Sequence, residues 1–413
     1  MPPPDREDMV TQSQPESAPA PGPAPAHAPD AETLRLLRDL IAFPSISRTS
    51  NMALIDYVRA YLAKLGVESR LVHDETGTKA NLFATLGPAD VPGILLSGHS
   101  DVVTVEGQDW ASDPFVLEAR DGRLHGRGTA DMKGFVASAL ALFGRTAGRA
   151  LQAPLHLALS YDEEIGCIGV RRLIDSLAGL PVRPRLCIVG EPTEMQVVVA
   201  HKGKAAWQVD VRGLEAHSSL APRAVNAIEY AAELIVFIRS LAAERARTGP
   251  RDEAFDVPFS TFQVGTISGG TALNVVAGNC RFAFEMRHLP DDDPEQQFAR
   301  ILAHAREVIE PAMKAISAEA GITFHALAAY PGLDMAPEDP AVALAKRLAG
   351  RNDHAKVAFG TEAGLFQKTA GIATVVCGPG HIAEAHRVDE WIAADQLGLC
   401  DRFLDRVADH LAS

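Results

Sequence analysis

Short apolar runs alternate with amphipathic segments along most of the chain. Residues 31–43 and 53–65 have the spacing of amphipathic helices, and Asp30 and Gly66 are residue types that favour helix starts and ends. Three strand-like runs follow, at 69–73, 81–87 and 93–99. An apolar helix is expected from about Met132 onward. This alternation predicts the α/β class, with a mostly parallel sheet flanked by helices on both faces.

The middle third of the chain has a different pattern. We expect strands at 205–213, 260–270, 279–289 and 322–330, and helices at 224–242 and 294–320. Their order, βαββαβ, is that of a ferredoxin-like unit. Alternating apolar and polar positions in these strands suit a sheet with one wet face. Such a unit inserted into an α/β domain would form a separate subdomain, and its edge strands would form a dimer seam.

These patterns divide the chain into four parts. A Pro- and Ala-rich extension at 1–29 has too few apolar residues to fold and is expected to be disordered. The catalytic domain is expected at 30–202 and 334–413, interrupted by the inserted dimerisation domain at 203–333.

Composition narrows the class of protein. The net charge of -14 argues against a nucleic-acid-binding protein, and no apolar stretch is long enough to span a membrane. The five cysteines lack CxxC spacing, so we expect free thiols in a reducing compartment, the cytoplasm.

Acidic and histidine residues recur just after the apolar runs. His99 and Asp101 follow residues 93–98, Glu163 and Glu164 follow 155–161, and Glu191 follows 186–190. In open α/β sheets, ligands bind beyond the carboxyl ends of the strands. Carboxylates and imidazoles gathered there are ligands that zinc accepts. The recurrence therefore predicts a metal site assembled by the fold.

Each of these residues also has a simpler interpretation. His99 could be an ordinary loop histidine, although Asp101, two residues on, would point to the same side and could orient it. Asp131, in GRGTADMKG, could bridge two cations or cap a helix. The pair Glu163 and Glu164 could be a solvated acidic turn, or one residue could bind metal while the other transfers a proton.

One further histidine is expected at the site, and two candidates share a loop. His386 and His381 both lie in GPGHIAEAHRVDEW, after the strand-like run ATVVCG. The local pattern does not decide between them.

A series of motifs links most of the chain to a known family. In order, they are SGHSDVV, WASDPF, GRGTADMKG, YDEEIG, GEPT, RGLEAHSS and AH-x-x-DE. In this order they resemble the dinuclear zinc amidohydrolases, a group of acetylornithine deacetylases, succinyl-diaminopimelate desuccinylases, glutamate carboxypeptidases and aminoacylases. The resemblance covers nearly all of the chain after the extension.

The resemblance implies two zinc ions per subunit, with cobalt as a substitute. His99 and Glu191 would hold one ion, and Glu164 and His386 would hold the other. Asp131 would bridge the two ions.

The resemblance also implies roles in catalysis and substrate binding. Glu163 would be the general acid/base for a hydroxide held between the metals, and Asp101 would orient His99. His217 would reach a partner subunit's active site in a homodimer and stabilise the oxyanion. Arg287 and Asn274 would bind the substrate's carboxylate, although Arg287 could instead be an outward, salt-bridging residue.

Within the group, FGTEAGLFQ and VVCGPGHIAEAHRVDEW are most similar to the acetylornithine deacetylase branch. This implies hydrolysis of N2-acetyl-L-ornithine to L-ornithine and acetate, a step of arginine biosynthesis. Glu362 would pair with the substrate's side-chain ammonium, or it could cap a helix. The alternatives are a broader N-acyl-amino-acid amidohydrolase, desuccinylase or dipeptidase, or a non-catalytic amino-acid-binding scaffold; the scaffold would be expected to have lost ligands that this chain keeps.

Overall fold

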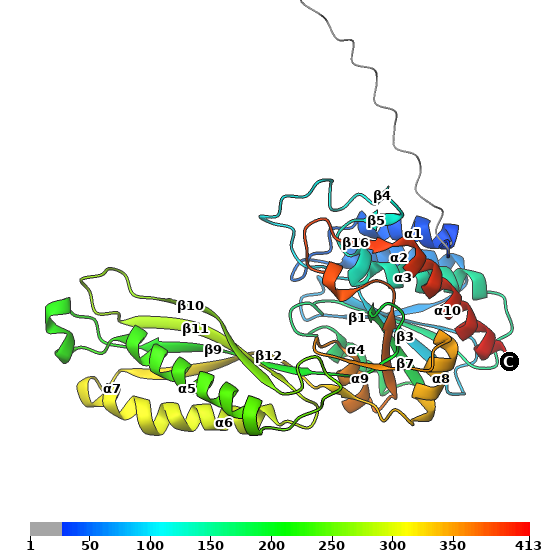
Figure 1. The fold of residues 1–413 in the computed structure, drawn as a ribbon. Helices are drawn as coiled ribbons and strands as arrows, with labels where there is room; N and C mark the ends of the chain where they lie inside the picture. The colour runs from blue at the N-terminus through cyan, green and yellow to red at the C-terminus, as the bar shows by residue number, and fades with distance from the viewer. Residues whose placement is uncertain (1–26) are drawn as a thin grey trace, which may run out of the picture.

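The computed structural model describes residues 27–413, which form two parts (Figure 1). Residues 1–26, most of the extension expected to be disordered, lie outside the described residues. One part is an α/β layered domain that contains both ends of the described chain. The other is an elongated unit that projects from it and is built from the middle of the sequence.

The layered domain is built on a nine-stranded sheet. Its strands in spatial order are β1 (Ser69–His73), β2 (Ala80–Leu86), β6 (Leu155–Ser160), β3 (Ile94–His99), β7 (Leu186–Pro192), β15 (Thr374–Gly378), β8 (Val198–His201) and β13 (Leu333–Asp334), with β14 (Ala355–Val357) also paired to β8. The central strands β6, β3, β7 and β15 are parallel, whereas antiparallel pairs occur towards both edges. The predicted α/β class with a mostly parallel sheet is therefore confirmed.

Helices cover both faces of this sheet, as a parallel sheet requires. One face carries α1 (Ala31–Ile41), α2 (Met52–Lys64), α3 (Gly134–Thr146) and α10 (Ala394–Ala412), and the other carries α4 (Val170–Leu177) and α9 (Ala363–Lys368) (Figure 1). Helix α8 (Pro340–Ala349) packs against β15 and α10. Asp30 caps α1 as predicted, since its side chain accepts a hydrogen bond from the Glu32 N–H at 2.8 Å.

A small sheet lies beside the large one and was not predicted. It is formed by β4 (Glu118–Arg120), β5 (Arg123–His125) and β16 (Trp391–Ala393). These strands are three residues long, too short to show a hydrophobic period. Their pairing joins the segment before residue 126 to the segment after residue 390.

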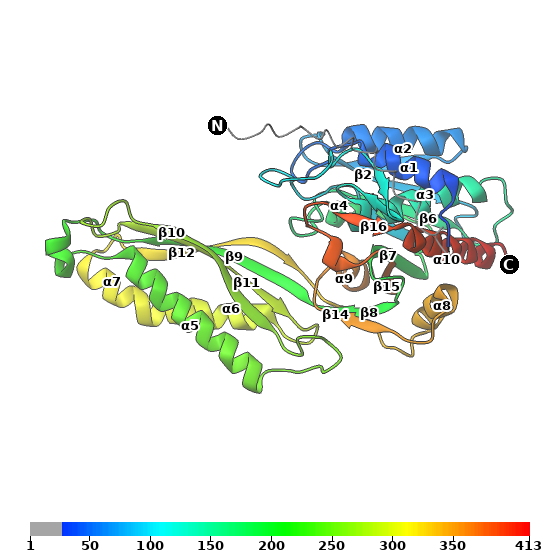
Figure 2. The same ribbon diagram turned by 45° about the horizontal axis from the view of Figure 1, so that its top comes forward.

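The projecting unit has the predicted βαββαβ order. It contains β9 (Gly203–Arg212), α5 (Ala227–Thr248), β10 (Thr261–Gly269), β11 (Asn279–His288), α6 (Pro294–His304), α7 (Glu310–Ile316) and β12 (Gly321–Tyr330), with sheet order β10-β11-β9-β12. The helices cover one face of the sheet (Figure 2). Trp207, Val209 and Val211 of β9 are buried in the core between the sheet and the helices.

The helix predicted over 294–320 is interrupted. A π-helical turn, η3 (Ala305–Ile309), separates α6 from α7. Pro311 explains the interruption, because proline has no N–H to donate and its ring clashes with the carbonyl four residues earlier.

Two further features of the described residues concern membrane spans and the cysteines. None of its helices combines the length and apolar character needed to cross a bilayer. All five cysteines are buried and unpaired.

Candidate metal centre and substrate pocket

His99 is the last residue of the buried strand β3, and its ring orientation is fixed by Asp101. His99 Nδ1 lies 2.9 Å from the Asp101 carbonyl oxygen and 3.5 Å from the Asp101 carboxylate. A carbonyl oxygen only accepts, so Nδ1 donates and Nε2 faces the other acidic residues. The sequence predicted an orienting contact from the carboxylate, but the carbonyl is the nearer partner.

The Asp101 carboxylate instead ties β3 to neighbouring segments. It accepts hydrogen bonds from the Glu163 N–H at 3.1 Å and from Ser47 Oγ at 2.7 Å. The end of β3 and the loop that follows β6 are thereby held together.

The first group of possible metal ligands, the first triad, is His99, Asp131 and Glu191. His99 Nε2 lies 2.9 Å from Asp131 Oδ1 and 3.7 Å from Glu191 Oε1. Glu191 lies in β7, and Asp131 lies in the π-turn η1 (Thr129–Lys133), where its backbone is extended rather than helical. All three side chains are buried.

The second triad is Asp131, Glu164 and His386. His386 Nε2 lies 3.1 Å from Asp131 Oδ2 and 2.8 Å from Glu164 Oε2. Asp131 therefore directs one oxygen to each triad, which is the arrangement a bridging carboxylate needs. His381, the competing histidine, is exposed and accepts a hydrogen bond from the Ala383 N–H at the start of η4 (Ile382–Glu384).

The electrostatics of this cluster fit divalent cations. Burial raises the pKa of Glu164 to about 7 and that of Glu191 well above its ordinary value. Burial would also raise the pKa of Asp131, but hydrogen bonds from His386 and His99 outweigh it and hold that pKa low. Among the described residues, no lysine or arginine forms an ion pair with these carboxylates.

The carboxylates raise the pKa of His99 and of His386, so the imidazoles balance part of their charge when protonated. Metal binding needs neutral imidazoles, and the buried carboxylates then need the positive charge of the ions. The carboxylate and imidazole donors are those that zinc, cobalt and manganese accept, and the ligand atoms of each triad lie within 4.8 Å of one another. The residues present therefore fit two divalent ions that share Asp131.

Glu163 belongs to neither triad but lines the same cavity of about 260 Å³. Burial raises the pKa of Glu163 to about 8, and the carboxylate of Glu164 acts in the same direction. Cys167 Sγ donates to Glu163 Oε1 at 3.2 Å. A carboxyl group with a pKa in this range can accept and return a proton near neutral pH.

The projecting unit supplies one wall of the cavity through Lys204, Arg287 and Tyr330. Arg287 Nη1 donates to the Tyr330 hydroxyl at 3.1 Å, and Arg287 Nε donates to Glu285 at 3.1 Å. Lys204 Nζ lies 3.2 Å from the same Glu285 carboxylate. Arg287 therefore forms the salt bridge weighed above and also faces the cavity.

Lys204 and Tyr330 were missed in the sequence. Lys204 pairs with Arg287 on one side and with Tyr330 on the other, so the three side chains share one face of the sheet. Only the strand register reveals this.

His217 and Asn274 lie elsewhere, in the segments that follow β9 and β10. These segments are at the end of the projecting unit farthest from the layered domain (Figure 1). We call residues 213–226 and 270–278 the tip. The tip segments are joined by a hydrogen bond from the Ser218 N–H to the Asn274 carbonyl at 3.0 Å and by a β-bridge between His217 and Val275. His217 is exposed and precedes η2 (Ser218–Arg223). Asn274 therefore lies away from Arg287, the other residue predicted to bind the substrate's carboxylate.

Glu362 does not line the cavity, contrary to its predicted contact with a substrate ammonium. It is 0% exposed, and its carboxylate accepts hydrogen bonds from Ser97 Oγ at 2.6 Å and Ser160 Oγ at 2.7 Å. It occupies the residue before α9, but its side chain makes no capping hydrogen bond. In this structure the side chain binds two serines and caps no helix, and its contact with a substrate ammonium stays a prediction.

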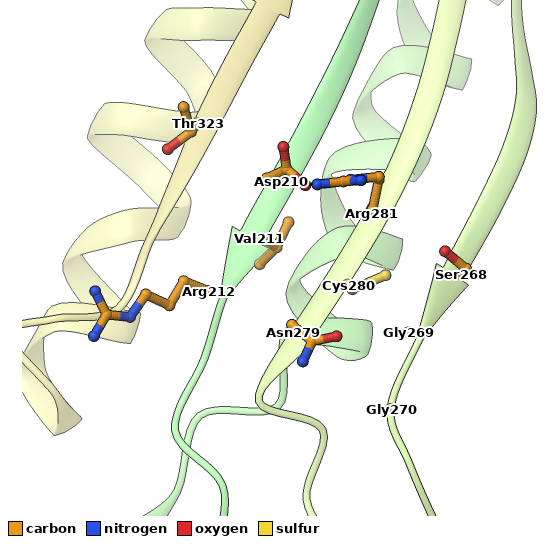
Figure 3. Close-up of a pocket in the computed structure, with 10 residues that line it drawn as sticks. All are labelled: Asp210, Val211, Arg212, Ser268, Gly269, Gly270, Asn279, Cys280, Arg281 and Thr323. Atoms are coloured by element: carbon orange, nitrogen blue, oxygen red, sulfur yellow. The ribbon is translucent and has the colours of Figure 1, made fainter.

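Another hollow, of about 480 Å³, lies near the tip on the projecting sheet (Figure 3). In it Asp210 and Arg281 point toward one another, and Arg281 Nε donates to Asp210 at 2.6 Å. The metal-ligating groups found among the described residues both lie outside this hollow. The cavity beside Asp131 is therefore the candidate active site.

Comparisons with known proteins agree with this assignment. The peptidase family M20/M25/M40 matches residues 95–410. Acetylornithine deacetylase from Myxococcus xanthus is 35% identical over 395 residues, covering 92% of this chain and 98% of that protein. Acetylornithine deacetylase from Proteus mirabilis is 35% identical over 376 residues, covering 87% and 91%.

Solved structures show the same fold at lower identity. An M20-family metallo-carboxypeptidase from Sulfolobus solfataricus superposes with a TM-score of 0.73 at 18% identity, covering 93% of this chain and 99% of that one. A dinuclear metal-binding M20 peptidase from Bacillus subtilis gives a TM-score of 0.60 at 17% identity, covering 92% and 97%. The chain therefore belongs to peptidase family M20/M25/M40 and is a metal-dependent amidohydrolase of the acetylornithine deacetylase type.

Proposed function

We propose that this protein hydrolyses N2-acetyl-L-ornithine to L-ornithine and acetate, as a cytoplasmic enzyme of arginine biosynthesis. The observation that carries the proposal is that Asp131 directs Oδ1 to His99 at 2.9 Å and Oδ2 to His386 at 3.1 Å. The choice of substrate is supported by the relatives named acetylornithine deacetylase that match over about nine tenths of the chain.

The proposed cofactor is a pair of zinc ions per subunit, for which cobalt can substitute. His99 and Glu191 would hold one ion, Glu164 and His386 the other, and Asp131 both. When bound, such a pair supplies Lewis acidity and makes a water molecule nucleophilic at neutral pH.

The chain's own residues would then complete the reaction. Glu163 is close to the cluster and has a pKa of about 8, so it can take a proton from water and pass it to the departing amine. Arg287 and Lys204 face the cavity and can bind the substrate's α-carboxylate, to which a guanidinium offers two parallel hydrogen bonds.

The proposed active form is a homodimer in which the tip enters the partner's site. His217 and Asn274 belong to the tip, which lies at the end of the projecting unit away from the layered domain of its own chain (Figure 1). They can therefore act on substrate only if a second copy places its metal centre beside them. In that position His217 would donate to the developing oxyanion, which needs a preorganised donor.

A broader N-acyl-L-amino-acid amidohydrolase is the second candidate, and one observation favours it. The acidic residues that line the cavity are Asp131, Glu163, Glu164 and Glu191, all assigned to metal binding or proton transfer. Among the described lining residues, none remains to pair with the ammonium of ornithine. The side-chain preference of such a pocket would be weak.

A substrate panel separates the two candidates. Zinc- and cobalt-reconstituted protein would be assayed with N2-acetyl-L-ornithine, N-acetyl-L-leucine, N-succinyl-L-diaminopimelate and a dipeptide, with Glu163→Gln as the inactive control. The highest kcat/KM is expected for N2-acetyl-L-ornithine. An equal or higher value for acetyl-leucine or the dipeptide would favour the broader enzyme.

A further inference from the structure

Glu390 is a buried residue outside the metal cluster whose carboxylate binds only the segment that carries Asp131. It is 1% exposed. Its Oε1 accepts from the N–H groups of Ala130 at 2.9 Å and Asp131 at 3.1 Å. Its Oε2 accepts from the Gly128 N–H at 3.0 Å and Arg127 Nη1 at 2.7 Å. Each oxygen is thus used twice, which leaves little freedom for the carboxylate to move.

The segment that Glu390 binds has no regular structure to hold it in place. Asp131 and Met132 have non-helical backbone angles within η1, and Gly128 has a left-handed φ of 88°. Buried backbone N–H groups need partners, and here Glu390 supplies them for Ala130 and Asp131. The location of the bridging ligand therefore depends on a side chain from elsewhere in the sequence.

That side chain belongs to the loop that carries His386, a ligand of the second triad. Glu390 follows His386 by four residues and directly precedes β16, which pairs with β5. The Glu390 carbonyl also accepts from the Gly126 N–H at 3.0 Å. One residue thus joins the segment of Asp131 to the segment of His386.

The two triads depend on this connection to different degrees. In the first triad, the shared Asp131 is the single ligand in an irregular segment, since His99 ends β3 and Glu191 lies in β7, two strands in the middle of the sheet. In the second triad, Asp131 and His386 both lie in irregular segments that meet at Glu390. A change at Glu390 should therefore disturb the second triad more than the first.

We propose that Glu390 is a positioning residue that sets Asp131 relative to His386 and thereby determines the affinity of the second metal ion. The inference rests on the proposed function only in requiring two metal ions. Glu390 acts through its hydrogen bonds to the Asp131 segment and does not contact the substrate.

The test is a zinc titration of the full chain after removal of metal with a chelator, followed by isothermal calorimetry. In Glu390→Gln, one oxygen becomes an NH2 group, which faces N–H donors and cannot accept from them. The affinity for the second zinc is expected to fall 10- to 100-fold, as it does when residues supporting metal ligands are changed. The affinity for the first should fall less than that for the second, because Asp131 is its single ligand in the segment that Glu390 binds. Glu384→Gln, the same substitution in the same loop, is the matched control and should bind zinc like the wild type.

A second variant and a second readout separate positioning from simple loss of structure. Glu390→Asp keeps the charge, so its second-site affinity should lie between those of the wild type and Glu390→Gln. Excess zinc should restore most of kcat in Glu390→Gln without a change in KM. Equal loss of both affinities, or a second-site affinity within twofold of the wild type, would overturn the proposal. If the wild type itself binds a single ion, the proposed function fails before this inference is reached.

Discussion

Replacing Glu362 tests whether this residue joins strands β3 and β6 rather than contacting the substrate. Ser97, in β3, and Ser160, at the end of β6, donate to the two oxygens of Glu362 at 2.6 and 2.7 Å. Both serines are 0% exposed, so water cannot replace the lost acceptor. Glu362→Leu removes both hydrogen bonds, whereas Glu362→Gln keeps one acceptor and adds a donor.

The expected cost follows from these two contacts. A hydrogen bond to a charged group contributes about 1.5–3 kcal/mol, so losing both costs about 3–6 kcal/mol. Burial raises the pKa of Glu362, because desolvation disfavours the charged carboxylate. Replacing the residue removes this cost, which offsets part of the loss. We therefore expect Glu362→Leu to lower the free energy of unfolding by about 3 kcal/mol, and Glu362→Gln by about 1 kcal/mol.

The assay combines urea denaturation with kinetics on two substrates. Because Glu362 does not touch the cavity, the ratio of kcat/KM for N2-acetyl-L-ornithine to that for N-acetyl-L-leucine should stay within about twofold of the wild type in both variants. Glu384→Gln serves as the control for a neutralised glutamate. A tenfold fall of this ratio in protein that remains folded would mean that Glu362 contacts the substrate's ammonium, and the reasoning above would be wrong.

Three further predictions concern the cavity and the tip. Glu163→Gln should lower kcat by about 10²- to 10⁴-fold while its zinc content stays at the wild-type level, whereas Glu164→Gln should lose zinc. Metal analysis and kinetics of both variants check this. Loss of zinc in Glu163→Gln but not in Glu164→Gln would mean that the two roles are reversed. Arg287→Met should raise KM at least tenfold for substrates with a free carboxylate but leave an amidated substrate unaffected, and equal effects on both would exclude carboxylate binding. His217→Ala and Glu163→Gln proteins, each nearly inactive alone, should recover about a quarter of wild-type activity when they are mixed and exchange subunits. Half of the dimers are then mixed, and one of the two sites in each mixed dimer has both residues. No recovery would exclude action of His217 across a dimer.

Several residues of the metal centre could be predicted because they lie at the carboxyl ends of strands, which the apolar runs in the sequence indicate. His99 and Glu191 lie at or near the ends of β3 and β7, and Glu163 and Glu164 follow the end of β6. Parallel strands bring such residues to one edge whatever the details of the loops. The choice of His386 over His381 could not be made this way, since both lie in one loop and only its conformation separates them.

The residues that sequence reasoning missed depend on pairing or on burial. Lys204 and Tyr330 face the cavity because of the register between β9, β11 and β12. Glu390 ends the AH-x-x-DE motif, but the sequence does not show that four donors of another segment converge on its carboxylate. The contacts of Glu362 could not be predicted either, because Ser97 and Ser160, which donate to it, lie on separate strands far from it in sequence.

The most direct test of the dinuclear centre is a crystal structure of the zinc-loaded protein with an anomalous-difference map at the zinc edge. Two peaks are expected, roughly 3.5–4 Å apart, one beside His99 and Glu191 and one beside Glu164 and His386, with an oxygen of Asp131 on each. A single peak, or two peaks of which only one contacts Asp131, would contradict the account.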